Sequence, residues 1–176
     1  MKFIETDLAG AYLIELDLKE DERGFLARTF CRGEFEKQGL ESRLAQANIS
    51  FNARRGTLRG MHYQAQPFAE VKLVHCVQGA LYDVIIDLRP DSQSYCCYYG
   101  VKLNAENRSM LYVPEGFAHG FQTLEDNTVI YYMISEFYAP QYVRGVRWND
   151  PVFGISWPFS DPIISERDRQ LPDYER

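Results

Sequence analysis

Hydrophobic and polar residues alternate with a period of two along most of the chain, a pattern typical of β-strands with two distinct faces. The clearest alternating runs are residues 11–18, 71–77, 81–88 and Thr128–Ile134. Glycine, proline and asparagine turns separate short strands of this kind, which favours a β-sandwich or a β-barrel. Two short stretches, 32–38 and 165–170, have a helical pattern instead. We expect the residues from Asp150 on, which are rich in proline and aromatics, to wrap the barrel without adding strands.

Length, charge and cysteine pattern narrow the class of protein. A chain of 176 residues predicts one domain, residues 1–176. The net charge of −6 gives no general attraction to nucleic acid or to anionic membranes. The four cysteines form no Cys-x-x-Cys pair, which indicates free thiols in a reducing compartment. The chain has neither a signal peptide pattern nor a transmembrane-length apolar run, so we expect a cytoplasmic protein.

His62 is a candidate general base, because the unperturbed pKa of histidine, about 6.5, suits proton abstraction. It lies in Arg59-Gly60-Met61-His62-Tyr63-Gln64. In a regular strand Arg59 and His62 point to opposite faces, so both reach one ligand only if the strand bulges, and Gly60 allows that. The alternative is a core histidine bonded to a neighbouring carbonyl.

Three other residue types suit the same chemistry. Lys72 lies in an otherwise apolar strand, either placing its charge beside a developing enolate oxygen or pointing outward into solvent. Tyr131 and Tyr132 are possible proton donors in Thr128–Ile134, although most such tyrosines only pack. Asp168 fits a Ser-x-x-Asp capping box, which the spacing favours, or a carboxylate that orients His62.

Arginines and amides are candidates for binding an anionic ligand. Arg23, Arg59 and Arg147 could form a diphosphate clamp, since guanidinium matches phosphate geometry, although most arginines are simply solvated. Gln46 and Asn48 alternate, so both amides can face one base edge.

A metal site is a further alternative. Pro114-x-Gly116-x-x-His119 is a pattern shared with metal-binding cupin barrels, and His62, His119 and Glu70 could supply three ligands. Gln64, however, stands where such sites usually have a second upstream histidine.

Ten segments, in order from Asp21 to Asp168, together resemble the dTDP-4-dehydrorhamnose 3,5-epimerase family. They are DERGF (21–25), QANIS (46–50), LRGMHYQ (58–64), KLV (72–74), YDV (82–84), DLR (87–89), PEGFAHGF (114–121), WNDP (148–151), ISWP (155–158) and SERD (165–168). The resemblance implies an all-β, cupin-type β-jelly roll with short peripheral helices, a homodimer, and an enzyme that needs neither metal nor cofactor.

The resemblance also implies a reaction: epimerisation of dTDP-4-dehydro-6-deoxyglucose at C3 and C5, in L-rhamnose supply for surface polysaccharide. It makes His62 the base oriented by Asp168, Tyr132 the acid and Lys72 the group that stabilises charge on O4. It gives substrate-binding roles to Arg23, Gln46, Asn48, Arg59 and His119.

The sequence departs from the family pattern at three places. Arg28 and Val143 stand where members often have substrate-contacting glutamates, and 133–136 reads MISE instead of the frequent Lys-x-Thr type. Another nucleotide such as CDP, or epimerisation at one carbon, therefore remains open. A metal-dependent cupin enzyme also remains open, as does a sugar-nucleotide-binding barrel without activity, although mere binding does not need all four proposed catalytic residues.

Overall fold

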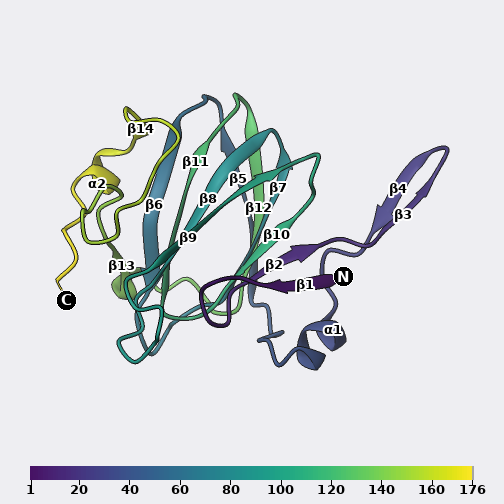
Figure 1. Cartoon of the computed structure of the whole chain (residues 1–176), viewed down its shortest axis with the longest axis horizontal. Helices are drawn as coiled ribbons and strands as arrows, with labels where there is room; N and C mark the ends of the chain where they lie inside the picture. Colours follow the sequence, from purple (N-terminus) through teal and green to yellow (C-terminus); the bar gives the residue numbers. More distant parts are fainter. Residues whose placement is uncertain (176) are drawn as a thin grey trace.

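Two facing β-sheets and a projecting hairpin make up most of the molecule (Figure 1). The computed structural model describes residues 1–175. The first sheet has the order β1-β2-β10-β7-β12-β5, the second has the order β13-β6-β11-β8-β9 with β14 beside β6, and β3 pairs with β4. The bounds are β1 Lys2–Glu5, β2 Tyr12–Glu15, β3 Leu18–Asp21, β4 Gly24–Ala27, α1 Arg32–Lys37, β5 Gln46–Asn52, β6 Thr57–Gln64, β7 Lys72–Gln78, β8 Ala80–Asp87, β9 Tyr98–Asn104, β10 Met110–Val113, β11 Phe117–Thr123, β12 Thr128–Ile134, the 3-10 turn Pro140–Tyr142, β13 Val143–Gly145, β14 Ile163–Ile164 and α2 Glu166–Arg169.

Strand alternation places one side-chain set of each sheet in the space between the sheets. There Val74, Leu81, Ile85, Leu111 and Ile130 form a buried core. Lys72 and Tyr132 belong to strands β7 and β12 on the same parity as Val74 and Ile130, so they also face this space. This arrangement, with only short helices at the edge, agrees with the expected β-jelly roll.

The C-terminal segment covers the outer face of the second sheet, where Val146, Phe153 and Trp157 pack against it. We expected this segment to wrap the barrel without adding a strand. The first part holds, but the segment does contribute one short strand. β14 pairs in parallel with β6, and Ile163 N donates to Gly56 O at 2.9 Å. This pairing holds the chain beside β6 just before α2 begins (Figure 1).

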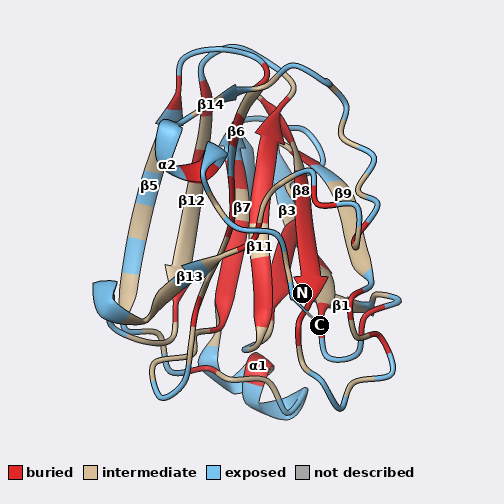
Figure 2. Cartoon of the chain, turned by 90° about the vertical axis from the view of Figure 1, so that its left-hand side faces the viewer, coloured by how far each residue is buried: buried red, intermediate tan, exposed pale blue. Residues whose placement is uncertain are grey.

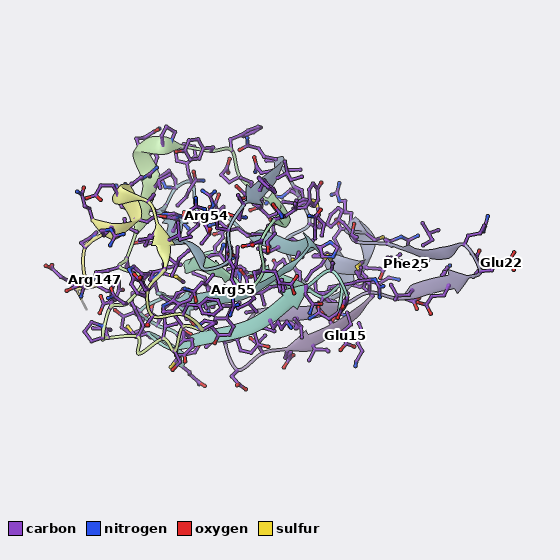
Figure 3. The ribbon with its side chains drawn as sticks, turned by 90° about the horizontal axis from the view of Figure 1, so that it is seen from above. Glu15, Glu22, Phe25, Arg54, Arg55 and Arg147 are labelled. Carbon is purple, nitrogen blue, oxygen red and sulfur yellow. The ribbon has the colours of Figure 1, made fainter. Side chains whose placement is uncertain are left out.

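The alternating run at 11–18 does not form one strand. β2 ends at Glu15, and β3 begins at Leu18 in a hairpin that projects from the barrel, here called the arm (18–27). Phe25 is 49% exposed and Leu26 is 73% exposed on the arm. Figure 3 shows Glu22 and Phe25 at the far end of the molecule from Arg147.

Burial is concentrated on the central strands, whereas partly buried and exposed residues alternate along β5 at the edge of the first sheet (Figure 2). Ile49 and Phe51 of this strand are 72% and 58% exposed. Within residues 1–175, no helix is both long and apolar enough to cross a bilayer.

Candidate active site

A bulge in β6 brings Arg59 and His62 to the same side of the strand. His119 pairs with His62 and Phe121 pairs with Arg59, so β6 carries one more residue than β11 between these two pairs. Gly60 has a φ of +136°, and a Cβ there would lie 2.5 Å from Gly120 Cα. Only glycine tolerates this conformation and this close approach. The expected bulge at Gly60 is confirmed.

Asp168 holds the imidazole of His62. His62 Nε2 lies 2.7 Å from Asp168 Oδ1, across 106 residues of sequence. Because a carboxylate only accepts, the ring donates from Nε2 and its Nδ1 is left free to accept a proton. Burial acts to raise the pKa of Asp168, yet the bonds from His62 and from Gly60 N outweigh it and leave that pKa below its ordinary value.

Asp168 also takes the helix position that its spacing predicts. Ser165 is the N-cap of α2, and its hydroxyl accepts a bond from Asp168 N at 3.1 Å. The cap uses the backbone of Asp168, whereas the bond to His62 uses its side chain. Both interpretations of Asp168 therefore hold at once.

Lys72 faces the interior of the barrel rather than solvent. Its Nζ donates to His62 O at 3.3 Å and lies 3.1 Å from Glu70 Oε1. The side chain is only 11% exposed. An ammonium this far from bulk water needs such partners.

Tyr132 reaches the same space from the facing sheet. It lines both cavities described below, as His62 does, while Tyr131 has the opposite parity on β12. Burial raises the pKa of the Tyr132 phenol above its ordinary value; the charge of Glu70 raises it further and Arg59 lowers it. The group is therefore a protonated donor at neutral pH.

His119 and Asp83 form a second imidazole–carboxylate pair. His119 Nε2 lies 2.7 Å from Asp83 Oδ1. Asp83 is fully buried, and within the described part of the chain its Oδ2 has no hydrogen-bond partner. Asp83 alternates with Leu81 and Ile85 of β8, which belong to the buried core, so it points toward this interior.

Two adjoining cavities share His62, Lys72, Tyr132 and Arg167 as lining residues. The larger, about 580 Å³, adds Arg59, His119 and Asp168, and is here called the Arg59 cavity. The smaller, about 240 Å³, is the Gln46 cavity; its further lining residues include Gln46, Asn48, Gln64, Glu70, Tyr138 and Val143. Arginine, histidine and lysine in the first cavity suit an anion, and amides beside a tyrosine in the second suit a planar base.

Gln64 fixes the segment that carries Tyr138. The Gln64 amide donates to Phe68 O and Phe137 O and accepts from Ala139 N at 2.7 Å. Gln46 Oε1 accepts from Tyr138 N, also at 2.7 Å. Gln64 is therefore fully engaged in a structural role at the position where metal-binding cupins often have histidine.

The proposed arginine clamp is not assembled within one chain. Of the three arginines of the predicted clamp, Arg59 alone lines the Arg59 cavity, where its Nε also donates to Asn52 Oδ1 at 2.8 Å. Arg23 lies on the arm and bonds Asp21. Arg147 is paired with Asp173 and lines neither cavity, so its inclusion in the clamp was wrong for the single chain.

Two of the three departures from the family pattern, Arg28 and Val143, lie in different places. Val143 lines the Gln46 cavity, whereas Arg28 lies at the base of the arm and donates to Glu34 Oε1 at 3.0 Å. Residues 1–175 contain no group of three or more histidine, cysteine or carboxylate side chains placed to hold one metal ion. His62 and His119 each bond their own carboxylate instead.

Sequence reasoning missed Arg167, Tyr138 and Asp83. Arg167 could have been found from the sequence, because it directly precedes Asp168 in the predicted short helix. The structure shows that this helix lies beside β6. Asp83 lies in the alternating run 81–88, but its pairing with His119 depends on strand register. Tyr138 follows an irregular turn whose direction no pattern predicts.

Comparisons with known proteins point to one family. The family model described as dTDP-4-dehydrorhamnose 3,5-epimerase matches residues 5–176. A dTDP-4-dehydrorhamnose 3,5-epimerase of Methanothermobacter thermautotrophicus is 44% identical over 171 residues, covering 96% of this chain and 91% of the relative.

Solved structures match over nearly the whole chain. The Bacillus anthracis dTDP-4-dehydrorhamnose 3,5-epimerase with TDP and PPi bound superposes with a TM-score of 0.95 at 43% identity, covering 98% of this chain and 99% of that one. The dTDP-6-deoxy-D-glucose-3,5-epimerase of Legionella pneumophila, in complex with dTDP-4-keto-L-rhamnose, has a TM-score of 0.92 at 32% identity, with 98% and 92% covered. The expected jelly roll is thereby confirmed, and the chain belongs to the dTDP-4-dehydrorhamnose 3,5-epimerase family.

Proposed function

We propose that this protein epimerises a nucleotide-linked 4-keto-6-deoxyhexose at C3 and C5, converting dTDP-4-dehydro-6-deoxy-D-glucose to dTDP-4-dehydro-L-rhamnose. One observation carries the proposal: His62 on the second sheet, which is bonded to Asp168, and the Tyr132 phenol on the first sheet line the same two cavities. A base and an acid on facing walls are what inversion of a carbon centre requires.

The proposed reaction uses the ketone of the substrate as the electron sink. Protons on C3 and C5 are both α to the C4 ketone, so His62 Nδ1 removes one and the electron pair moves to O4. The Lys72 ammonium stabilises the enolate, and Tyr132 delivers a proton to the opposite face of the carbon. Tyr132 then regains a proton from solvent and His62 loses one. We propose that this chemistry uses no metal and no cofactor.

We propose that each cavity binds a different part of the substrate. We assign the diphosphate and the sugar to the Arg59 cavity, which Arg59 and His119 line together with the residues that both cavities share. We assign the base to the Gln46 cavity, where Gln46 and Asn48 offer amide groups. The whole chain, residues 1–176, is proposed to act as one domain, in the cytoplasm as its cysteine pattern indicates.

We propose a homodimer in which the arm of one copy completes the site of the other. Arg23 lies on the arm, away from the cavities of its own chain. Exposed Ile49 and Phe51 line the Arg59 cavity at the edge strand β5, and the arm presents exposed Phe25 and Leu26. A second copy would cover both apolar sets and bring Arg23 to the diphosphate.

The test is NMR in deuterated water with dTDP-4-dehydro-6-deoxyglucose and metal-free protein. Deuterium entering both C3 and C5 supports the proposal, and entry at one carbon assigns a mono-epimerase instead. Exchange that appears only when metal is added supports the metal-dependent alternative. No exchange under any condition overturns the proposed substrate, and a CDP-linked 4-keto sugar is then the next to try because of Arg28 and Val143.

A further inference from the structure

Glu70 places a carboxylate on the wall of the Gln46 cavity, close to the groups proposed to react. It lies two residues before Lys72, so in extended chain both side chains point the same way. Glu70 Oε1 lies 3.1 Å from Lys72 Nζ, and the two side chains are 9% and 11% exposed. The reaction proposed above assigns no role to the Glu70 carboxylate.

The carboxylate and a backbone carbonyl hold the Lys72 ammonium from two sides. Lys72 Nζ donates to His62 O at 3.3 Å and lies beside Glu70. A lysine side chain is long and flexible, and its ammonium is costly to bury without partners. The two contacts therefore determine where the positive charge lies relative to His62.

Glu70 also influences the facing wall. After burial, its charge is the next largest cause that raises the pKa of Tyr132, and Arg59 opposes it. The charged and titratable groups that share the two cavities with Tyr132 are Arg59, His62, Tyr63, Glu70, Lys72, His119, Tyr138, Arg167 and Asp168. Glu70 and Asp168 are the carboxylates among these lining residues, and Asp168 is engaged with His62.

We propose that Glu70 is a positioning residue of the epimerisation: its carboxylate holds the Lys72 ammonium where O4 of the substrate binds and balances the positive charge beside Tyr132. The inference rests on the proposed function, since it uses the roles given there to Lys72 and Tyr132. Glu70 acts through these two residues and need not touch the substrate.

Glu70→Gln tests this, because it keeps the size of the side chain and removes its charge. We expect kcat for deuterium entry at C5 to fall about tenfold while KM changes less than about threefold. The alkaline limb of the kcat profile should move to lower pH, because loss of the carboxylate favours the tyrosinate. Glu70→Asp should restore the position of that limb. Glu36→Gln, which breaks the exposed pair with Arg32, should leave both readouts native.

Lys72 provides a readout that does not depend on activity. The side-chain ammonium of Lys72 in protein labelled with ¹⁵N-lysine is assigned by its absence from Lys72→Met, and it should shift in Glu70→Gln but not in Glu36→Gln. In the Lys72→Met background, Glu70→Gln should lower kcat less than it does in the wild type, because its effect through Lys72 is already lost.

Native kcat with a native alkaline limb in Glu70→Gln overturns the proposal, and so does a Lys72 resonance that stays in place. If the wild-type protein exchanges no deuterium, the proposed function fails, and the ¹⁵N measurement alone then decides whether Glu70 holds Lys72. Circular dichroism of each variant checks that a loss of kcat does not come from unfolding.

Discussion

His62 and His119 lie directly opposite each other on the paired strands β6 and β11, and each imidazole contacts a buried carboxylate through Nε2. The two pairs differ in solvent access, because the His62 side chain is 33% exposed and that of His119 is 12% exposed. The more open ring, His62, lines both cavities, whereas His119 lines the Arg59 cavity. This difference favours His62 as the base and His119 as a binding group.

His62→Ala should abolish deuterium uptake into the sugar, by at least about 100-fold, because a positioned general base contributes that much to proton transfer. The measurement is NMR of C3 and C5 in deuterated water. His75→Gln is the matched control, since His75 lies on the opposite face of β7 from Lys72 and lines neither cavity. Substantial residual exchange in His62→Ala would remove it as the base.

Asp168→Asn should affect both catalysis and stability. The pKa of Asp168 is lowered in the folded protein, so its carboxylate stabilises the native state above the unfolded pKa of about 3.9 and loses this effect as pH falls through the folded pKa. We expect the free energy of unfolding at pH 7 to drop by about 1–3 kcal/mol. The difference in the free energy of unfolding between Asp168→Asn and the wild type should become smaller below about pH 4. Urea denaturation at several pH values measures this, and a gap independent of pH would contradict it.

Asp168 also shows what sequence pattern can and cannot predict. Ser165 and Asp168 lie three residues apart, so local geometry alone predicts the cap. The bond between His62 and Asp168 depends on β14 docking beside β6, which no periodicity encodes. The sequence offered the bond to His62 only as an alternative to the cap, and the family resemblance implied it; the structure places Asp168 Oδ1 2.7 Å from His62 Nε2.

The strand at Thr128–Ile134 was predictable from its alternating run, and its bounds match the structure. Lys72 was ambiguous because both faces of 71–77 are apolar: one faces the barrel core and the other faces Phe35 and its neighbours. The arm was not predicted, since alternation at 11–18 continues across the break at Leu16 and Asp17. A sequence pattern reports local conformation, whereas the direction of a hairpin depends on what it packs against.

Tyr132→Phe should impair epimerisation at C5 by about 100-fold or more while the fold survives, because the variant loses only the phenolic proton donor. Tyr131→Phe on the same strand is the control and should keep native turnover. The ratio of C5 to C3 deuterium entry is the measurement. Wild-type C5 turnover in Tyr132→Phe would exclude it as the acid.

Arg23→Ala should lower activity in the proposed homodimer although Arg23 lies outside the cavities of its own chain. Mixed with inactive His62→Ala under conditions that exchange subunits, it should regain part of the activity, because one site then pairs a native His62 with a native arm. Light scattering establishes the oligomeric state, and Phe51→Asp should shift it toward monomer. A monomeric wild-type protein, or mixing without any recovery, would contradict an arm that acts in trans.

Gly60→Ala tests the bulge that aligns Arg59 with His62. The new Cβ would lie 2.5 Å from Gly120 Cα and 3.1 Å from His119 O, both backbone atoms that cannot rotate away, and φ at this position is +136°. We expect the free energy of unfolding to fall by more than about 2 kcal/mol. Gly33→Ala in α1 is the matched control: its Cβ meets nothing within 4 Å, so the same change should stabilise the protein by about 0.5–1 kcal/mol. Opposite signs for the two alanines in urea denaturation would confirm that the close approach of β6 to β11 requires glycine, whereas a neutral Gly60→Ala would show that the bulge tolerates a side chain.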